Sequence, residues 1–447
     1  MKNIFSKTII LSVCLMLNSI SFGAEALTFE DAYTLMIKNN KGLKAASKAV
    51  EEKKYKKRAA IGHFLPSVGL NMTYTHLDDE QGFNFFGMSI PVQKQDLYWV
   101  GMGANWNVFT GGRILAANSA ARANFEGANQ KYKEKVNELT VDLIKRYYGL
   151  RLAEDVVKVR EQVLESVQGH LEDAKKLEKA GIIAKSERLH AEVAYSEAER
   201  ELKAAIRDKN VVEKSLFSLV QNKDKNNENG EFSASSNLFM FKGTLPSQED
   251  FLKMTMKSNT SLKLLDVKKR LARANFRSEV GNYFPTINLF AYDIMGSADL
   301  TQLAPRWAMG ASLNFNVFDG FSRFNNVMAA KALKEQTQYE IEDAQEGIEL
   351  LVNKYYQELL KYQEQYESTD KSIEMAQEAL RVSELSFKEG LSTSLSVTDA
   401  QSTLAAAKIA RLNSIYNYDV ALSELLSLQG SAGQIVDYIK NSKTEQL

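Results

Sequence analysis

Apolar residues alternate with small or polar residues in four segments of the chain, which form two pairs. The apolar face of the first pair comprises Val68, Leu70, Met72 and Tyr74, followed by Val100, Met102, Ala104, Trp106 and Val108. The second pair ends with the same pattern in Trp307, Met309, Ala311, Leu313, Phe315 and Val317. The strand that starts at Pro285 is less regular, because Phe290 and Tyr292 share the face of Asn288. A period of two with unlike faces predicts a sheet with two different surroundings, built from β-hairpins at residues 66–109 and 285–318.

Outside these pairs, the apolar positions follow the spacing of long helices. One seam of three- and four-residue steps contains Ile348, Val352, Tyr355, Leu359, Tyr362 and Tyr366, and another contains Ala198, Leu202, Ala205, Val212, Leu216 and Leu219. All five prolines lie elsewhere, so residues 92–245 and 306–447 contain none. Such seams are typical of coiled coils, and a helix from Arg113 to Ala180 would be about 100 Å long at ~1.5 Å per residue. We expect two such helices, each ended by a glycine in the left-handed conformation, at Gly181 and Gly390.

These elements belong to a duplication. Phe64-Leu65-Pro66 is matched by Tyr283-Phe284-Pro285, and Asn107-Val108-Phe109-Thr110-Gly111 by Asn316-Val317-Phe318-Asp319-Gly320, at separations of 219 and 209 residues. Two halves built alike typically line one shared axis or cavity. We divide the chain into a first repeat at 25–221, a linker at 222–245, a second repeat at 246–430 and a tail at 431–447. The linker is rich in Asn, Lys, Ser and Glu, a composition typical of a flexible segment.

The first 24 residues have the features of a secretory signal peptide. Lys2 and Lys7 flank an apolar run that is too short to span a bilayer as a helix, and cleavage is expected after Ala24 or Ala26. The single cysteine, Cys14, lies within this run, so the exported chain has no disulfide chemistry and we expect no lipid attachment. The 56 basic and 56 acidic residues cancel, which leaves no net field to attract nucleic acid.

The strand pattern also predicts how copies of the chain assemble. Strands of about 11 to 13 residues suit a tilted membrane crossing. Four strands cannot close a barrel, however, and an open edge in lipid leaves backbone groups unpaired at several kcal/mol each. Two copies would supply eight strands around an interior filled by side chains, whereas three would supply twelve and leave room for water. The small and polar inner faces favour a homotrimer, although the same alternation fits a soluble antiparallel sheet packed on helices.

Motifs for catalysis, metals and cofactors are not convincing. His63, His76, His170 and His190 lack the spacing of metal ligands. Gly101-Met102-Gly103 lies within a predicted strand and lacks the third glycine of a dinucleotide site. The tyrosines at equivalent helical positions of the two repeats, Tyr147, Tyr148, Tyr355 and Tyr356, are typical of core packing. We expect a protein that is not an enzyme and that holds no metal or cofactor.

The order and duplication of these features resemble the TolC-like outer-membrane efflux proteins. The resemblance covers residues 27–440 and is carried by the signal peptide, Leu27-Thr28-Phe29-Glu30-Asp31-Ala32, Phe64-Leu65-Pro66, Asn107-Val108-Phe109-Thr110-Gly111-Gly112 and the repeated helix pairs. It implies a trimer whose 12-stranded transmembrane β-barrel, in the outer membrane of a Gram-negative bacterium, continues into a periplasmic α-barrel of coiled-coil-like helical hairpins. It also implies a passive exit duct, for a tripartite efflux pump or a type I secretion system, served by a periplasmic adaptor (membrane fusion) protein and an inner-membrane pump.

The resemblance implies roles for the remaining segments. Residues 28–62 and 247–281 would form the helices that lead into the hairpins, and residues 222–245 would join the C-terminal region in a belt around the tunnel. Residues 77–97 and 296–305 would be the loops outside the cell, the first with Phe83, Phe85, Phe86 and Met88. The turns at Gly181 and Gly390, with Leu391, would lie at the periplasmic tip, where the tunnel narrows and meets the adaptor.

The candidate gate residues follow from the same resemblance. The family's gate segment can carry an Arg two residues after the glycine and acidic residues six and nine after it. In the second repeat Ser392 and Ser396 replace the first two and Asp399 keeps the third, whereas in the first repeat Glu187 keeps an acid beside Ser186. Three copies of Asp399 would form an anionic ring that favours cations. In the alternative interpretation, favoured for Glu187, both acids are solvated charges or helix N-terminal charges.

The missing ionic partner changes the expected closed state. Because Ser392 cannot form a salt bridge, we expect weaker hydrogen bonds to hold the gate, or Lys185, Arg188 or Lys388 to act instead. A rival function is that of a periplasmic adaptor or structural coiled-coil protein without a conducting pore. An adaptor would normally have one helical hairpin flanked by soluble β domains, whereas this chain has two long hairpins and two membrane-like strand pairs. The cargo stays open, because the pump selects what enters a passive tunnel.

Overall fold

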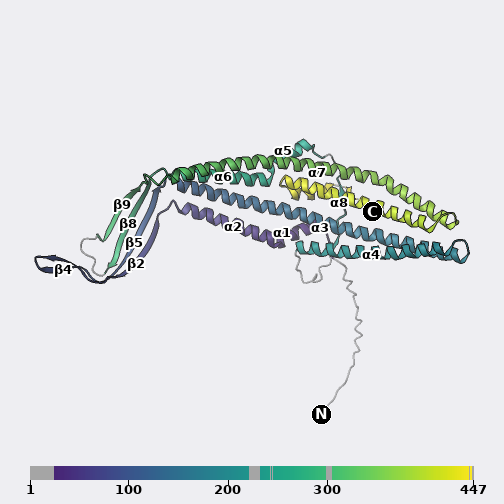
Figure 1. Ribbon diagram of the computed structural model, residues 1–447, viewed down its shortest axis with the longest axis horizontal. Helices are drawn as coiled ribbons and strands as arrows, with labels where there is room; N and C mark the ends of the chain where they lie inside the picture. Colours follow the sequence, from purple (N-terminus) through teal and green to yellow (C-terminus); the bar gives the residue numbers. More distant parts are fainter. Residues whose placement is uncertain are drawn as a thin grey trace, which may run out of the picture.

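The computed structural model is a long bundle of helices with a small sheet at one end (Figure 1). It describes residues 25–220, 232–241, 243, 245–297, 305–441 and 443–444. The predicted signal peptide at residues 1–24 therefore lies outside the described residues. The two repeats run side by side along the length of the molecule, with the sheet formed jointly at one end and two helical turns at the other (Figure 1).

Both repeats have the predicted order of a leading helix, a strand pair and two long helices, except that the leading helix is divided into two. The first contains β1 (Glu25–Leu27), α1 (Phe29–Asn39), α2 (Lys41–Gly62), β2 (Ser67–His76), β3 (Gln81–Phe85), β4 (Met88–Gln93), β5 (Asp96–Phe109), α3 (Arg113–Lys179) and α4 (Lys185–Val220). The linker contains β6 (Phe232–Ala234) and β7 (Phe239–Met240), and the second repeat contains α5 (Gln248–Ser258), α6 (Thr260–Gly281), β8 (Thr286–Ser297), β9 (Trp307–Asn314), α7 (Ser322–Lys388) and α8 (Ser394–Leu428). A 3-10 helix η1 (Ala432–Gln434), α9 (Ile435–Asn441) and β10 (Lys443–Thr444) follow.

The four predicted membrane strands form one antiparallel sheet in the order β2-β5-β8-β9. Directly opposed pairs such as Leu70 with Met102 and Leu289 with Ala311 place apolar side chains on one face, which we call the outer face. The other, inner face carries glycines, asparagines and serines, among them Gly69, Asn71, Gly103 and Ser312. The predicted alternation is confirmed. The outer face is open to its surroundings, with Met72 and Met309 each 73% exposed.

Two details of the strands differ from the sequence-based expectation. The last strand ends at Asn314 rather than at residue 318, because β8 begins at Thr286, the partner of Asn314, and offers nothing further to pair with. Instead, Arg323 of α7 donates to the carbonyl of Val317 at 3.2 Å and holds this stretch against the helix. The first predicted loop, residues 77–97, contains a separate hairpin formed by β3 and β4. Most of the second loop, residues 298–304, lies outside the described residues.

The two long helices end where the glycines predict. Helices α3 and α7 each have 67 residues and stop just before Gly181 and Gly390, whose φ angles are 73° and 75°. In this conformation the amide of Ile182 reaches the carbonyl of Leu177 at 2.9 Å, and the second turn is closed in the same way. A side chain at φ > 0 costs about 1 kcal/mol or more, which is why glycine ends these helices.

The helices form two successive layers of four. Near the sheet, α2, α3, α6 and α7 lie side by side, with α3 packed on α2 and α6, and α7 packed on α6 (Figure 1). In the other half, α4 and α8 replace the short helices, so that α3 packs on α4 and α8, and α7 on α8. The predicted seams face these neighbours, since Ile348, Val352 and Leu359 are all buried.

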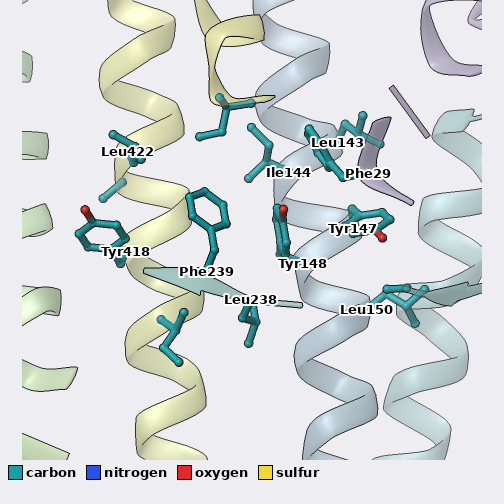
Figure 2. Close-up of a cluster of buried hydrophobic side chains, with 14 of the residues drawn as sticks. Phe29, Leu143, Ile144, Tyr147, Tyr148, Leu150, Leu238, Phe239, Tyr418 and Leu422 are labelled. Atoms are coloured by element: carbon teal, nitrogen blue, oxygen red, sulfur yellow. The ribbon is translucent and has the colours of Figure 1, made fainter. Parts of the chain in front are cut away.

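The main core lies midway along the bundle, where short segments cross the long helices. Figure 2 shows Tyr147 and Tyr148 of α3 between Phe29 and Phe239, with ring centroids 5.5 to 5.6 Å apart. Tyr147 and Tyr148 are fully buried, and the hydroxyl of Tyr147 donates to the carbonyl of Leu27 at 2.6 Å. Their predicted role in packing is confirmed. Burial of each such side chain stabilises the fold by roughly 1.5–3 kcal/mol.

The segment between the repeats is less irregular than its composition predicts. Residues 221–231 lie outside the described residues, but Phe232 and Phe239, in β6 and β7, are fully buried. Strand β6 pairs in parallel with β1, and β7 pairs with β10 near the C-terminus. The apolar residues Phe232, Leu238, Phe239 and Met240 outweigh the polar composition here, because burying them repays the entropy of ordering the chain.

Two asparagines interrupt the helices that lead into the sheet. Asn40 separates α1 from α2, and Asn259 separates α5 from α6. The Asn40 side chain accepts from the amides of Gly42 and Leu43, and Asn259 accepts from Leu262, so each asparagine caps the following helix. Their side-chain amides donate to the last turns of α4 and α8, at Leu219 and Leu428. The expected helices therefore exist as bent pairs whose bend is fixed by the ends of the long hairpins.

Candidate functional site at the helical tips

The two helix-helix turns lie against each other at the end of the bundle far from the sheet. A methyl group on Gly390 would come within 3.2 Å of Cγ2 of Ile182, which shows how closely the turns approach. Leu391 is 84% exposed, and Gly181, Gly390 and Ile182 are also exposed. The structure thus brings the predicted tip residues together at a surface that is open to solvent or to a partner.

A small apolar cluster joins the two hairpins just behind the turns. Its buried members are Leu171 and Ala174 of α3, Ala191 of α4, Phe387 of α7 and Val397 of α8. Because all four long helices contribute, the cluster holds the first hairpin against the second. It is separate from the main core and much smaller, so only a few side chains oppose a movement of one hairpin relative to the other.

A polar link crosses the same junction. The backbone amide of Ser394, in the first turn of α8, donates to Oε2 of Glu187 at 2.7 Å, and the Ser394 hydroxyl lies 2.8 Å from Nε2 of His170. Ser394 is fully buried and His170 is 6% exposed, with its ring packed on Phe387 at a centroid distance of 4.5 Å. Glu187 therefore places its negative charge at the positive end of α8, where the free amides and the helix dipole stabilise it.

Burial determines the protonation of His170. Its pKa is lowered from the ordinary value mainly because the surrounding helices desolvate the imidazolium, while the carboxylates of Asp173 and Glu187 oppose this shift. The neutral ring is the form that fits a hydrogen bond with the hydroxyl of Ser394. The link thus favours the neutral form of His170.

An ion pair also connects the two helical hairpins near the turns. Lys388, the last residue of α7, lies 3.3 Å from Oδ2 of Asp173 on α3. Arg188 remains within its own hairpin, where it pairs with Glu178 at 2.6 Å and with Glu192. Lys185 is exposed. Of the three basic residues considered from the sequence, Lys388 is thus the one with an ion pair between the hairpins among the described residues.

The other candidate gate residues lie around this link. Asp399 is exposed, and its backbone carbonyl accepts from the hydroxyl of Thr403. Ser396 is exposed in the first turn of α8, where its amide donates to Thr393. Ser392 is half-buried and Ser186 is exposed. The contacts of Asp399 within one chain do not place its side chain at a constriction. Its role in an anionic ring therefore stays a prediction.

Glu187 differs from the sequence-based interpretation in one respect. It does lie in the first turn of α4, where an acid is expected to interact with the helix dipole. However, its carboxylate also bonds to the other hairpin, which is 207 residues away in the sequence. His170, Asp173 and Ser394 were not selected from the sequence, because local spacing cannot reveal contacts between segments so far apart. This set of polar contacts, in which His170 and Ser394 are buried, becomes visible only when the two turns are placed together.

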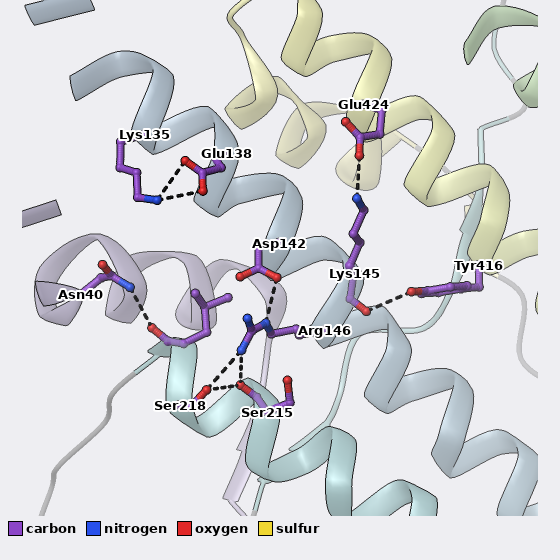
Figure 3. Close-up of polar contacts among 11 residues, drawn as sticks. Asn40, Lys135, Glu138, Asp142, Lys145, Arg146, Ser215, Ser218, Tyr416 and Glu424 are labelled. Atoms are coloured by element: carbon purple, nitrogen blue, oxygen red, sulfur yellow. Dashed lines mark hydrogen bonds and ion pairs between the residues drawn. The ribbon is translucent and has the colours of Figure 1, made fainter. Parts of the chain in front are cut away.

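Helices α4 and α8 are both attached to α3 near the middle of the molecule (Figure 3). Arg146 donates to the carbonyl of Ser215 on α4 at 2.8 Å and pairs with Asp142 on its own helix. On another side of α3, Lys145 pairs with Glu424 of α8 at 2.6 Å. These links, together with the main core, keep the middle of the bundle fixed. The turns therefore lie at the ends of long helices whose main contacts are at the middle of the bundle.

Two classes of site were also sought among the described residues. No helix in that part of the chain is long and apolar enough to cross a membrane. In the same part, no group of three or more histidines, cysteines or acidic residues is arranged to hold a metal ion.

Comparisons with known proteins agree with this architecture. The family model of the outer membrane efflux proteins matches residues 32–220 and 252–431. No curated protein sequence matches the chain.

Several solved structures share the fold. A membrane protein from Pseudomonas aeruginosa has a TM-score of 0.79 and 16% identity, with 91% of each chain covered. VceC from Vibrio cholerae has a TM-score of 0.77 and 15% identity, covering 90% of this chain and 96% of that chain. The CmeC outer membrane channel of Campylobacter jejuni has a TM-score of 0.76 and 14% identity, covering 99% and 98%. At these identities the likeness shows a common fold along almost the whole chain.

Proposed function

The chain belongs to the family of outer membrane efflux proteins and is an outer-membrane efflux channel, and we propose that three copies form the passive exit duct of a tripartite efflux pump or a type I secretion system. The sheets of the three copies join into a 12-stranded barrel in the outer membrane of a Gram-negative bacterium. The helices continue as a tunnel through the periplasm. The duct itself carries out no catalysis.

The open four-stranded sheet is the observation that carries this proposal. Its edge strands β2 and β9 have no strand beyond them within the described chain, and its outer face is apolar and exposed. In lipid each unpaired backbone group at such an edge costs several kcal/mol. Joining β9 of one copy to β2 of the next pairs these backbone groups. The polar inner face then lines the lumen and does not face lipid. Three copies leave a lumen lined by the glycines, asparagines and serines of the inner face.

Export follows from the N-terminal segment. Residues 1–24 act as a signal peptide that is cleaved after Ala24. Support for this cleavage point comes from β1, which begins at Glu25 and pairs with β6, and from the carbonyl of Leu27, which accepts from Tyr147. Cleavage after Ala26 would remove two of the three residues of β1.

The exposed tips suit contacts with a periplasmic adaptor, and the pump in the inner membrane supplies energy and cargo. Leu391, Ile182 and Leu395 expose apolar side chains at the turns. Behind them, the link between Glu187, Ser394 and His170 and the ion pair between Lys388 and Asp173 hold the second hairpin in a closed position. Three copies of Asp399 then surround the narrow axis as an anionic ring. The adaptor opens the duct by weakening these contacts.

Purification and channel recording test this proposal. We expect heat-modifiable trimers in outer-membrane detergent extracts and ion-conducting channels in planar bilayers. The substitution Asp399→Ala should reduce block by divalent cations and change the single-channel conductance, whereas Glu389→Ala, which removes an exposed acid outside the proposed ring, should do neither. A soluble periplasmic monomer would instead support the adaptor or structural coiled-coil function. Unchanged cation block in Asp399→Ala would remove this residue from the gate while leaving the duct intact.

A further inference from the structure

The inner face of the sheet contains a hollow that the function described so far does not use. Its volume is about 470 Å³. The floor is formed by Gly101 and Gly103 of β5, and the walls by the aromatic rings of Trp99, Phe290 and Tyr292. Asn71 and Asn105 contribute side-chain amides at its margin. All these residues come from the three adjacent strands β2, β5 and β8.

The strand register explains why this hollow exists. Gly101 lies opposite Asn71 of β2, and Gly103 lies opposite Tyr292 of β8. On the same face, Asn105 lies opposite Phe290, and Trp99 is one inward position from Gly101. The inward glycines Gly103 and Gly69, which lie opposite each other on β5 and β2, leave a gap between the surrounding side chains. A glycine within a strand often marks a place where another group approaches the backbone closely.

Two of the aromatic rings pack directly over glycines. A Cβ atom on Gly101 would lie 2.8 Å from Cζ3 of Trp99, and one on Gly310 would lie 2.8 Å from Cζ of Phe290. Trp99 therefore leans over Gly101, which is buried even though the sheet is open, and Phe290 leans over Gly310. Covering glycine with an aromatic ring supports a strand. It does not account for Gly103, where the nearest atom to an added Cβ is a carbonyl oxygen 3.9 Å away.

The chemistry of the hollow selects a class of ligand. The face of an aromatic ring carries partial negative charge, which attracts cations, and other flat rings stack on it in an offset arrangement. The carbonyl of Asp293 lies 3.2 Å from the position of a Cβ on Gly101, and the asparagine amides add further acceptors. Lysine and arginine are absent from the described residues that line the hollow. Its volume falls in the range of pockets for small organic molecules, roughly 300–1,000 Å³.

We infer that the Trp99–Phe290–Tyr292 hollow is a binding site for planar aromatic cations in the lumen of the barrel. The inference rests on the proposed trimeric duct, in which the inner face becomes the lumen wall and three such sites surround one axis. Each site would hold a cargo molecule briefly before release, by stacking on the rings. The site thus names a class of cargo that the duct itself prefers, in addition to any selection by the pump.

Filling the hollow tests the inference. The substitution Gly103→Val adds a branched side chain that favours strands, at a position with open space. Ser312→Val adds bulk to the same inner face, on β9 and outside the hollow, and serves as the control. Ethidium added to planar bilayers should block the wild-type channel. Its half-blocking concentration should rise roughly tenfold in Gly103→Val and in Tyr292→Ala, and change little in Ser312→Val. Equal block in all variants would overturn the inference.

A fluorescence measurement separates this inference from the proposed function. The chain has three tryptophans, and Trp106 and Trp307 belong to the outer face, so Trp106→Phe with Trp307→Phe leaves Trp99 as the only emitter. Ethidium should quench Trp99 saturably in detergent-solubilised trimers, and Gly103→Val should abolish the saturable part. Channels that conduct but show no saturable quenching would overturn the inference alone. Saturable quenching in a protein that forms no channel would overturn the proposed duct while supporting the site.

Discussion

The contact between Glu187 and Ser394 provides the most direct test of how the tips are held. The substitution Glu187→Ala removes a charge-assisted hydrogen bond of 2.7 Å that joins the start of α4 to the start of α8. A hydrogen bond to a charged group contributes about 1.5–3 kcal/mol when it is protected from water. Because Glu187 is half-buried, solvent reduces this to about 1–2 kcal/mol. A change of this size shifts the ratio of open to closed tips by a factor of about 5–30.

Distance measurements between spin labels can detect this shift. Ile182 and Leu395 are each 55% exposed and lie on the two turns, so they can be replaced by cysteine and labelled. The only native cysteine, Cys14, is within the predicted signal peptide and will not interfere. We expect the distance distribution to gain a longer component in Glu187→Ala. Glu187→Gln retains an uncharged acceptor and should have an intermediate effect.

A matched control separates the contact from a general loss of charge. Glu389 is an exposed acid next to Gly390, and Glu389→Ala removes the same charge from the same tip without a hydrogen bond to the other hairpin. Its distance distribution should match that of the wild type. If Glu187→Ala and Glu389→Ala give the same distribution, the bond to Ser394 does not hold the tips together, and the reasoning is refuted.

Three further predictions concern other parts of the molecule. Burial lowers the pKa of His170, so the stability it contributes is present above the ordinary imidazole pKa of about 6.5 and is lost as the pH falls through the lowered value. His170→Gln should therefore flatten the increase in tip opening as the pH falls from about 7.5 to 5, measured as hydrogen exchange relative to the intrinsic exchange rate at each pH. Burial raises the pKa of Asp419 well above its ordinary value, so the wild type should lose stability as the pH rises from about 4 toward that pKa. Thermal unfolding of Asp419→Asn should lack this decline. An identical pH profile of stability in both proteins would contradict the prediction. Gly111→Ala would place a Cβ 2.1 Å from the carbonyl oxygen of Gly281 and should prevent assembly of heat-stable trimers. Gly112 has a similar positive φ but open space around it, so Gly112→Ala should lower the free energy of unfolding by only about 1 kcal/mol in a denaturation curve.

Much of the fold follows from local patterns. The alternation from Val68 to Tyr74 predicts a strand because only a period of two places those side chains on one face. The glycines at 181 and 390 predict the ends of the long helices because an L-residue resists the left-handed conformation found there, with φ near 75°. The bends at Asn40 and Asn259 were not predicted, since neither proline nor glycine marks them. Their asparagine caps were the available signal.

The candidate site was less accessible from the sequence than the fold. Its general location follows from the two glycine turns, and Lys388 was among the residues considered. The partners of these residues could not be predicted, because the link between Glu187 and Ser394 and the ion pair between Lys388 and Asp173 join different repeats. The hollow on the sheet was missed for a related reason. Phe290 and Tyr292 looked irregular in their own strand, and only the register with β5 shows that they face Gly103 and its neighbours.

The sequence by itself determined the elements of this protein and their duplication, because strand alternation, helical seams and left-handed glycines depend on residues close together in the chain. Tertiary structure alone decided which faces meet. It placed the two strand pairs in one sheet with free edges at β2 and β9, and it brought the two helical turns together around His170 and Ser394. The contact at the turns joins residues 224 positions apart in the chain, which no local pattern encodes. The elements of the fold can therefore be predicted from the sequence, whereas the contacts between the two turns are visible only in three dimensions.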